Sequence, residues 1–171
     1  MKKVILLTFS LLLTYVSAQE APAVSKTEFS EEALAQTITG LDGQEVTIAS
    51  VLEKHKGKIV VLELWAGWCK DCLEGLPAAH ELRKNNPDVD FVHFSLDKNF
   101  DLWKKNLEKF ELQNGDNYWF SSGWKNVFDN YIDLNWIPRF IVISPDGKIA
   151  KYYAVTADDP EVRKAIDELL K

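Results

Sequence analysis

The sequence contains only two cysteines and three histidines in 171 residues, and it has no cluster of basic residues. A zinc site needs three or four ligands, and His55, His80 and His93 do not lie at metal-ligand spacing from the cysteine pair. We therefore expect no metal and no other cofactor. A net charge of −6 without a basic patch also argues against nucleic-acid binding.

The overall composition is that of a soluble globular protein, with 46% hydrophobic and 27% charged residues. The length suits one domain of ordinary size with its own core. The sequence shows no internal repeat and no low-complexity segment that would suggest another organisation.

The first 18 residues have the pattern of a bacterial signal peptide. A basic start, MKK, is followed by an apolar stretch over residues 4–16, and VSA at residues 16–18 fits a small-x-small cleavage signature. At about 13 residues the apolar stretch is short for a membrane span, which needs roughly 20. We expect cleavage after Ala18 and a periplasmic or secreted protein, with an uncleaved anchor as the alternative.

The remaining sequence predicts a flexible polar leader over residues 19–33 and one domain over residues 34–171. In the domain, β-branched and apolar runs predict strands, and apolar residues at helical spacing predict helices. The expected elements are a hairpin over 37–48, a helix over 49–57, a strand over 58–65, a helix over 70–86, a strand over 89–97, helices over 100–112 and 122–132, a hairpin over 139–153 and a closing helix over 158–171. This order indicates a mixed α/β sheet with helices on both faces.

The two cysteines lie at the point where a strand gives way to a helix. Cys69 follows the buried strand at the expected helix start, where free N–H groups and the helix dipole favour a thiolate. We expect the pKa of Cys69 to lie below the free value of about 8.5. Cys72 lies one turn further on, where it can resolve a mixed disulfide formed by Cys69, as thiol–disulfide exchange requires.

Less active roles for the pair are disfavoured. A structural disulfide across so short a loop removes little chain entropy, so it would contribute little stability. A pair of inert thiols is the remaining alternative. Redox exchange is the interpretation that the position of the pair favours.

The segment ELWAGWCKDC, residues 63–72, resembles the thioredoxin active site, in which an apolar strand runs into Trp-Cys-x-x-Cys. From about Thr37 onward the chain is more closely similar to the exported thioredoxin-like thiol–disulfide oxidoreductases of the TlpA/ResA group. Pro77 matches their helix proline, and NVFDNYIDLNWIPRFIVISPDGKI, residues 126–149, resembles their segment before and through a cis-proline. The resemblance implies a thioredoxin fold with an N-terminal β-hairpin extension and a helical insertion before the cis-proline.

The resemblance also implies roles for five residues. Cys69 is expected to attack and Cys72 to resolve. Pro138 falls at the cis-proline position, where the backbone of Ile137 would pair with an extended client segment. Trp68 would lie on the rim as an apolar docking surface, with ordinary packing as the alternative.

Glu63 interrupts the apolar strand six residues before Cys69. The matching position of cytosolic thioredoxins holds a buried aspartate near the resolving cysteine, so we expect Glu63 to move the proton of Cys72. The alternative is a glutamate that reaches solvent. Many members of the group carry a glutamate three residues after the second cysteine, but this chain has Gly75 there, and Glu74 is expected to face elsewhere.

The region before Pro138 is rich in aromatic residues. The default interpretation is that these aromatic residues pack in the core. The more specific interpretation is that Trp124 or Trp136 lines a substrate groove near Cys69. The aromatic cluster comprises Tyr118, Trp119, Phe120, Trp124, Phe128, Tyr131 and Trp136. His80 and His93 are expected to be hydrogen-bonded structural residues.

The resemblance implies an exported thiol–disulfide oxidoreductase that exchanges the Cys69–Cys72 pair with disulfides of cell-envelope clients. We expect a reductant, with apocytochromes among the clients considered and a membrane electron donor that reduces the pair again. Between the cysteines, Lys70 favours a thiolate and Asp71 opposes it. A proline there usually marks a reductant, and its absence leaves the direction of exchange open. One alternative is a peroxiredoxin-related peroxidase, but the Thr-x-x-Cys that it needs is missing. A non-catalytic binding module of the same fold is the other.

Overall fold

The computed structural model describes residues 20–113 and 115–171. The expected signal peptide lies outside the described residues. The described chain forms one seven-stranded sheet with the strand order β2-β1-β5-β4-β3-β6-β7. The strands are β1 (Thr37–Gly40), β2 (Glu45–Thr47), β3 (Val60–Trp65), β4 (Asp90–Ser95), β5 (Asp116–Trp119), β6 (Arg139–Ile143) and β7 (Ile149–Ala154).

The sheet is mixed. β3, β4 and β5 run parallel to one another, whereas β6 and β1 lie antiparallel on either side of them. All six residues of β3 are buried. Burial on both faces explains why this strand has a nearly continuous apolar sequence.

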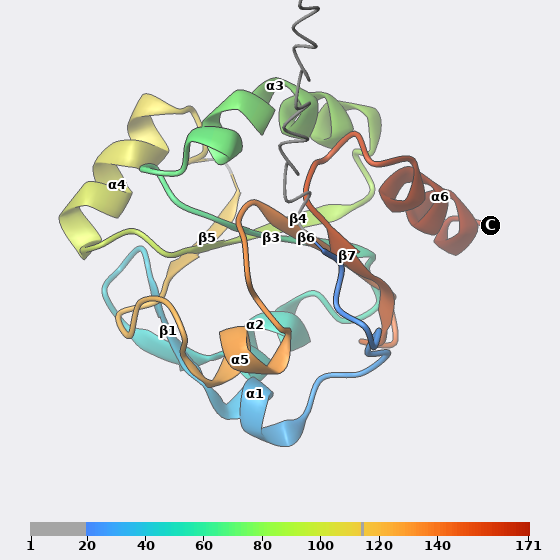
Figure 1. The fold of residues 1–171 in the computed structure, drawn as a ribbon, viewed down its shortest axis with the longest axis horizontal. Helices are drawn as coiled ribbons and strands as arrows, with labels where there is room; N and C mark the ends of the chain where they lie inside the picture. Colours follow the sequence, from blue (N-terminus) through green and yellow to red (C-terminus); the bar gives the residue numbers. More distant parts are fainter. Residues whose placement is uncertain (1–19, 114) are drawn as a thin grey trace, which may run out of the picture.

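Helices cover both faces of the sheet, as the sequence predicts. In Figure 1, α3, α4 and α6 lie on one side and α1, α2 and α5 on the other. Their bounds are α1 (Glu31–Ala35), α2 (Ile48–Lys54), α3 (Lys70–Asn85), α4 (Phe100–Lys109), α5 (Val127–Tyr131) and α6 (Pro160–Leu169). In the part of the chain that the structure describes, no helix is both long and apolar enough to cross a membrane.

Local sequence signals explain several helix boundaries. α6 begins at Pro160, after the N-cap Asp159, whose side chain accepts a hydrogen bond from the Glu161 N–H. α5 begins later than the predicted residue 122, because Gly123 and Lys125 have positive φ angles of 66° and 68°. Pro77 lies inside α3, as expected.

The segment before the cis-proline holds the helix α5, as the expected helical insertion requires, and also a strand that the sequence analysis did not predict. This strand is β5, which pairs with β4 on one side and β1 on the other. β5 therefore joins the N-terminal hairpin to the central sheet. Its sequence, DNYW, begins with two residues that are rare in strands and continues with two aromatic residues that favour them, so the local signal is mixed and too short to predict the strand.

The packed part of the chain also begins earlier than residue 34. Thr27 accepts a hydrogen bond through its carbonyl oxygen from the Ile149 N–H, at 2.8 Å. The Phe29 ring stacks on Phe128 with 5.6 Å between ring centroids, and Ala33 of α1 is fully buried. These contacts place residues 26–33, expected in a flexible leader, against the domain.

Asp129 of α5 is a buried carboxyl group. Its Oδ2 accepts a hydrogen bond from Asn126 Nδ2 at 3.0 Å, whereas its Oδ1 has no hydrogen-bond partner among the described residues. Burial raises the pKa of Asp129 from 3.8 to about 7, and backbone N–H groups of Lys125 and Asn126 partly oppose this rise. The folded state therefore favours the neutral carboxyl.

This shift predicts that ionisation of Asp129 at higher pH lowers the free energy of unfolding, and that Asp129→Asn removes this effect. Between pH 3.8 and about 7 the folded protein binds a proton that the unfolded chain has lost, so the free energy of unfolding falls as pH rises through this window. Relative to wild type, Asp129→Asn should gain up to about 4 kcal/mol more at pH 8 than at pH 4. Urea unfolding at both pH values measures the difference. The exposed variant Asp88→Asn is the control, and an equal difference at both pH values would contradict the assignment.

Candidate active site

Cys69 is the N-cap of α3. Its Sγ accepts a hydrogen bond from the Cys72 N–H at 3.1 Å, and the two cysteines form a disulfide with 5.3 Å between their Cα atoms. Cys69 is 6% exposed and Cys72 is 2% exposed. The structure confirms the predicted position of the pair at the helix start. In the reduced protein, the free N–H groups of this helix end would stabilise a thiolate on Cys69.

The turn between β3 and Cys69 is held by the end of β4. The Gly67 N–H donates to Asp97 Oδ1 at 3.1 Å, and Asn106 Nδ2 donates to the same oxygen at 3.1 Å. A Cβ at Gly67 would lie 2.0 Å from Asn106 Nδ2 and 2.8 Å from its Cβ, so only glycine fits. Asp97, Asn106 and Gly67 are positioning residues that the sequence analysis missed. The polar residues Ser95 and Asp97 at the carboxyl end of a core strand were the sequence signal that could have indicated this contact.

The Ile137–Pro138 peptide bond is cis, as predicted. Ile137 is buried, and its carbonyl oxygen lies 3.4 Å from Cys69 Sγ. The loop before β6 therefore lies against the disulfide. In the reduced protein this oxygen could accept a hydrogen bond from the Cys69 thiol.

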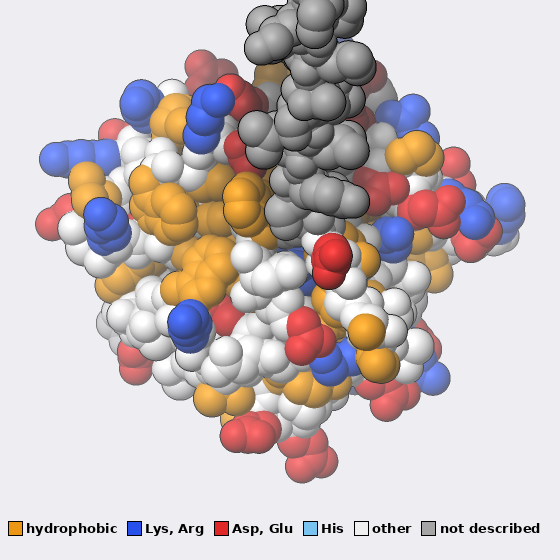
Figure 2. Space-filling view, in the orientation of Figure 1, with side chains coloured by type: hydrophobic (Ala, Val, Ile, Leu, Met, Phe, Trp, Pro, Cys, Tyr) orange, Lys and Arg blue, Asp and Glu red, His pale blue; other side chains and the backbone are white. Residues whose placement is uncertain are grey.

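A pocket of about 260 Å³ opens beside the disulfide. It is lined by Trp68, Cys69, Lys70, Asp71, Trp124, Asn135, Trp136 and Ile137. Trp68 and Trp136 are 52% and 48% exposed, which is unusual for side chains of this size. Figure 2 shows hydrophobic side chains gathered on the viewed face, below α3 and to the right of α4 in the orientation of Figure 1.

Trp136 reaches across the pocket to the residue between the cysteines. Its Nε1 donates to Asp71 Oδ2 at 3.1 Å. The neighbouring Lys70 pairs instead with the exposed Glu74, at 3.4 Å. Of the aromatic cluster, Phe120 and Phe128 pack in the core, as the default interpretation holds, whereas Trp124 and Trp136 line the pocket, as the more specific one proposes.

Glu63 lies in a buried polar network. Its Oε2 is 3.0 Å from His93 Nδ1, and His93 Nε2 is 3.0 Å from Arg83 Nη2. Because arginine can only donate, His93 accepts at Nε2 and donates from Nδ1 to Glu63. Burial lowers the pKa of Arg83, and the Glu63 charge opposes this shift. His93 is thus a hydrogen-bonded structural residue, as expected, whereas the buried Nε2 of His80 has no partner among the described residues.

The side chain of Glu63 is directed to His93 of the neighbouring strand, which is its register partner on β4. The predicted proton transfer between Glu63 and Cys72 stays a prediction. Within residues 20–113 and 115–171, no group of three or more metal-ligating side chains could hold a metal ion.

The arrangement as a whole defines a class of protein. A disulfide caps the helix that follows the central strand, and a cis-proline loop lies against it on a mixed sheet covered on both faces. These features together define a thioredoxin-fold protein. A family profile described as thioredoxin-like matches residues 57–149, more than half of the chain. The chain belongs to this thioredoxin-like family.

Curated relatives match part of the chain. The thiol-disulfide oxidoreductase ResA of Bacillus cereus is 31% identical over 107 residues, which cover 61% of this chain and 57% of ResA. The chloroplastic protein SUPPRESSOR OF QUENCHING 1 of Arabidopsis thaliana is 29% identical over 106 residues, which cover 55% of this chain and 9% of that protein. The match therefore spans little more than half of one relative and a small part of the other.

Solved structures match a larger share of the chain. A Bacteroides vulgatus protein, described as a candidate thiol-disulfide oxidoreductase, is 31% identical with a TM-score of 0.67, covering 83% of this chain and 90% of its own. A secreted Mycobacterium tuberculosis disulfide oxidoreductase homologous to Escherichia coli DsbE is 25% identical with a TM-score of 0.60, covering 82% of this chain and 100% of its own.

The charge of Asp71 predicts a measurable effect on Cys69. Asp71→Asn removes a negative charge beside both sulfurs, while the amide oxygen can still accept the Trp136 hydrogen bond. We expect the pKa of Cys69 in the reduced protein to fall by roughly half a unit, because a nearby like charge disfavours the thiolate. The pH dependence of iodoacetamide alkylation measures this pKa. Asp88→Asn, at an exposed position beyond the C-terminal end of α3, is the matched control, and an unchanged pKa of Cys69 in Asp71→Asn would refute the effect.

Proposed function

We propose that this protein is an exported thiol–disulfide oxidoreductase that exchanges the Cys69–Cys72 pair with disulfides of client proteins. The observation that carries the proposal is the position of Cys69. Its sulfur caps α3, lines a pocket beside two exposed tryptophans and lies 3.4 Å from the Ile137 carbonyl oxygen. The thiol-disulfide oxidoreductase ResA and the secreted mycobacterial enzyme, which share this fold, support it.

In the reducing direction, the Cys69 thiolate attacks one sulfur of a client disulfide. A mixed disulfide forms, and the first client sulfur leaves as a thiolate that takes a proton from solvent. Cys72 then loses its proton and attacks Cys69 Sγ, which releases the second client thiolate. The client disulfide gains two electrons, and the Cys69–Cys72 pair loses two. A membrane electron donor of the dithiol class would return the pair to its reduced form.

The pocket and the cis-proline loop would receive the client. An extended client segment would pair with the backbone at Ile137 next to Pro138, in the manner of strand addition. Trp68, half exposed beside Cys69, would contact apolar client side chains next to the cysteine. Disulfide-containing cell-envelope proteins, apocytochromes among them, are the client class that we propose.

The bacterial periplasm or cell exterior is the location that we propose. The signal-peptide pattern of the first 18 residues supports export. A disulfide at the active site is also compatible with an oxidising compartment.

Exchange activity is tested with an insulin-reduction assay in the presence of dithiothreitol. We expect Cys69→Ser to lower the rate at least 100-fold, because the attacking sulfur is lost. Cys72→Ser should instead accumulate a mixed disulfide with a client, since the resolving thiol is missing. Non-reducing gels and intact mass measure that adduct.

Three outcomes of this and related assays would contradict the proposal. Full activity in Cys69→Ser would show that another group reacts. An inert wild type that still binds clients would indicate the non-catalytic module. Turnover with hydrogen peroxide as the sole oxidant, but none with insulin, would indicate the peroxidase.

A role of Glu63 in releasing the Cys72 proton is tested with Glu63→Gln. We expect resolution of a preformed mixed disulfide to slow about tenfold near neutral pH, while its formation by Cys69 is unchanged. Rapid-quench measurements across pH separate the two steps. If both steps kept wild-type rates while thermal stability fell, Glu63 would serve only its buried contact with His93.

A further inference from the structure

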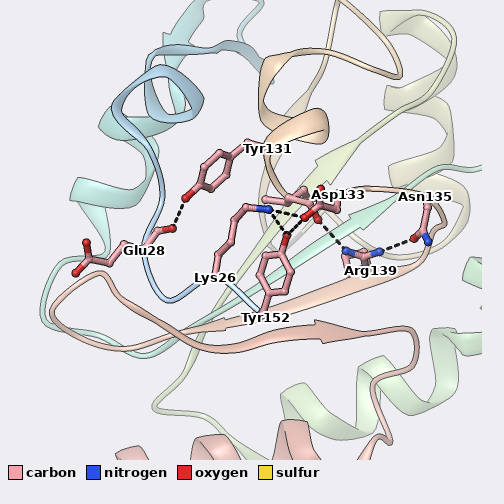
Figure 3. A network of polar contacts seen from close by, with 8 residues as sticks. Lys26, Glu28, Tyr131, Asp133, Asn135, Arg139 and Tyr152 are labelled. Carbon is pink, nitrogen blue, oxygen red and sulfur yellow. Dashed lines mark hydrogen bonds and ion pairs between the residues drawn. The ribbon is translucent and has the colours of Figure 1, made fainter. Parts of the chain in front are cut away.

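A fully buried arginine follows the cis-proline. Arg139 is 0% exposed and is the first residue of β6. Its Nη2 donates to Asn135 Oδ1 at 2.8 Å, and its Nη1 donates to the Ile132 carbonyl oxygen at 3.2 Å (Figure 3). The guanidinium thus contacts both the start and the middle of residues 132–138, which we call the docking loop.

Burial of a charged guanidinium at the position of Arg139 is energetically unfavourable. Burial lowers the pKa of its guanidinium, and its Nε has no hydrogen-bond partner among the described residues. Its guanidinium carbon lies 4.2 Å from the centre of the Tyr153 ring, which offers a favourable cation–π contact. The hydrogen bonds of Nη1 and Nη2 both go to the docking loop, so the two ends of the arginine fork hold that loop.

The N-terminal segment, residues 20–29, holds the docking loop from outside. Lys26 forms an ion pair with Asp133, and its Nζ also donates to Tyr152 Oη at 3.0 Å. Tyr152 in turn donates to Asp133 Oδ2 at 2.8 Å (Figure 3). Asn135 Nδ2 donates to the Glu20 carbonyl oxygen at 3.3 Å. The loop therefore lies between the buried guanidinium and the N-terminal segment.

The other side of the docking loop faces the reactive disulfide. Asn135, Trp136 and Ile137 line the pocket beside Cys69. Trp136 donates to Asp71, and the Ile137 carbonyl oxygen lies 3.4 Å from Cys69 Sγ. Any displacement of the loop would change the surface that meets a client segment, although Arg139 itself does not line the pocket.

We propose that Arg139 is a positioning residue that sets the docking loop for polypeptide clients, and that the Lys26–Asp133 pair supports it from the surface. The proposal rests on the proposed exchange function and adds a distinction between substrates. A polypeptide disulfide needs the docking loop for its flanking residues. A small aromatic disulfide such as dithiobis(nitrobenzoate), DTNB, needs only the Cys69 sulfur.

The experiment compares the two substrates in full-length variants. Arg139→Met keeps the length and apolar stem but removes the donors, and Lys26→Met removes the support from the N-terminal segment at a partly exposed position. We expect Arg139→Met to raise the KM for a disulfide peptide at least tenfold and Lys26→Met to raise it about threefold, with kcat within twofold. The DTNB rate should stay within twofold for both. Lys56→Met, at an exposed lysine just after the C-terminal end of α2, is the matched control.

Hydrogen exchange of residues 132–138 supplies a readout that needs no turnover. Faster exchange in Arg139→Met and Lys26→Met, with the rest of the sheet unchanged, is expected. Unchanged exchange in the loop, or an equal loss of peptide and DTNB rates, would overturn the positioning role. If Arg139→Met does not fold, Lys26→Met decides by the same two readouts. If the wild-type protein reacted with neither substrate, the proposed exchange function would be refuted. Hydrogen exchange of the docking loop would still decide whether Arg139 and Lys26 hold that loop in place.

Discussion

The active site depends on one local constraint, the placement of a sulfur atom at the N-terminus of α3. Cys69 must leave β3, end the strand conformation and cap the helix within four residues of Trp65. Only there do free backbone N–H groups point at the sulfur and favour its ionised form. The turn that achieves this needs glycine at residue 67, because the Asn106 side chain occupies the space of a Cβ.

Two sets of polar contacts hold the walls of the site. On one side, Asp97 joins the Gly67 turn to α4 through Asn106. On the other, Arg139 and the N-terminal segment hold the loop that carries Trp136 and Ile137. The hydrogen bond between Trp136 and Asp71 connects the two walls across the pocket. The disulfide thus lies between two walls that are held by separate sets of contacts and are linked to each other by this hydrogen bond.

Features set by local sequence could be predicted, and features set by tertiary pairing could not. The apolar run over 60–65, the cysteine pair at a helix start and the proline at 138 each carry their own signal, and the structure confirms them. β5 and α1 were missed, because both are short and depend on neighbours. In β5 only Tyr118 and Trp119 favour a strand, and α1 is a single short helix that packs through the buried Ala33, although its N-cap Ser30 was a local signal that the sequence analysis did not use.

The same distinction applies to the site residues. The contact between Glu63 and His93 spans 30 residues, and that between Asp71 and Trp136 spans 65, so no spacing rule connects their partners. Glu63 was recognised as an unusual charge in a buried strand, but its hydrogen-bond partner could only come from the register of β3 against β4. Arg139 gave no signal, since a single arginine after a proline reads as a surface residue.

The most direct test of this account is the ionisation of the Cys69 thiol in the reduced wild-type protein. The rate of alkylation by iodoacetamide, followed across pH with mass spectrometry to locate the label, should give a midpoint clearly below about 8.5, with the label on Cys69 rather than Cys72. A midpoint at or above that value, or equal labelling of both cysteines, would contradict the claim that the helix N-terminus activates this sulfur.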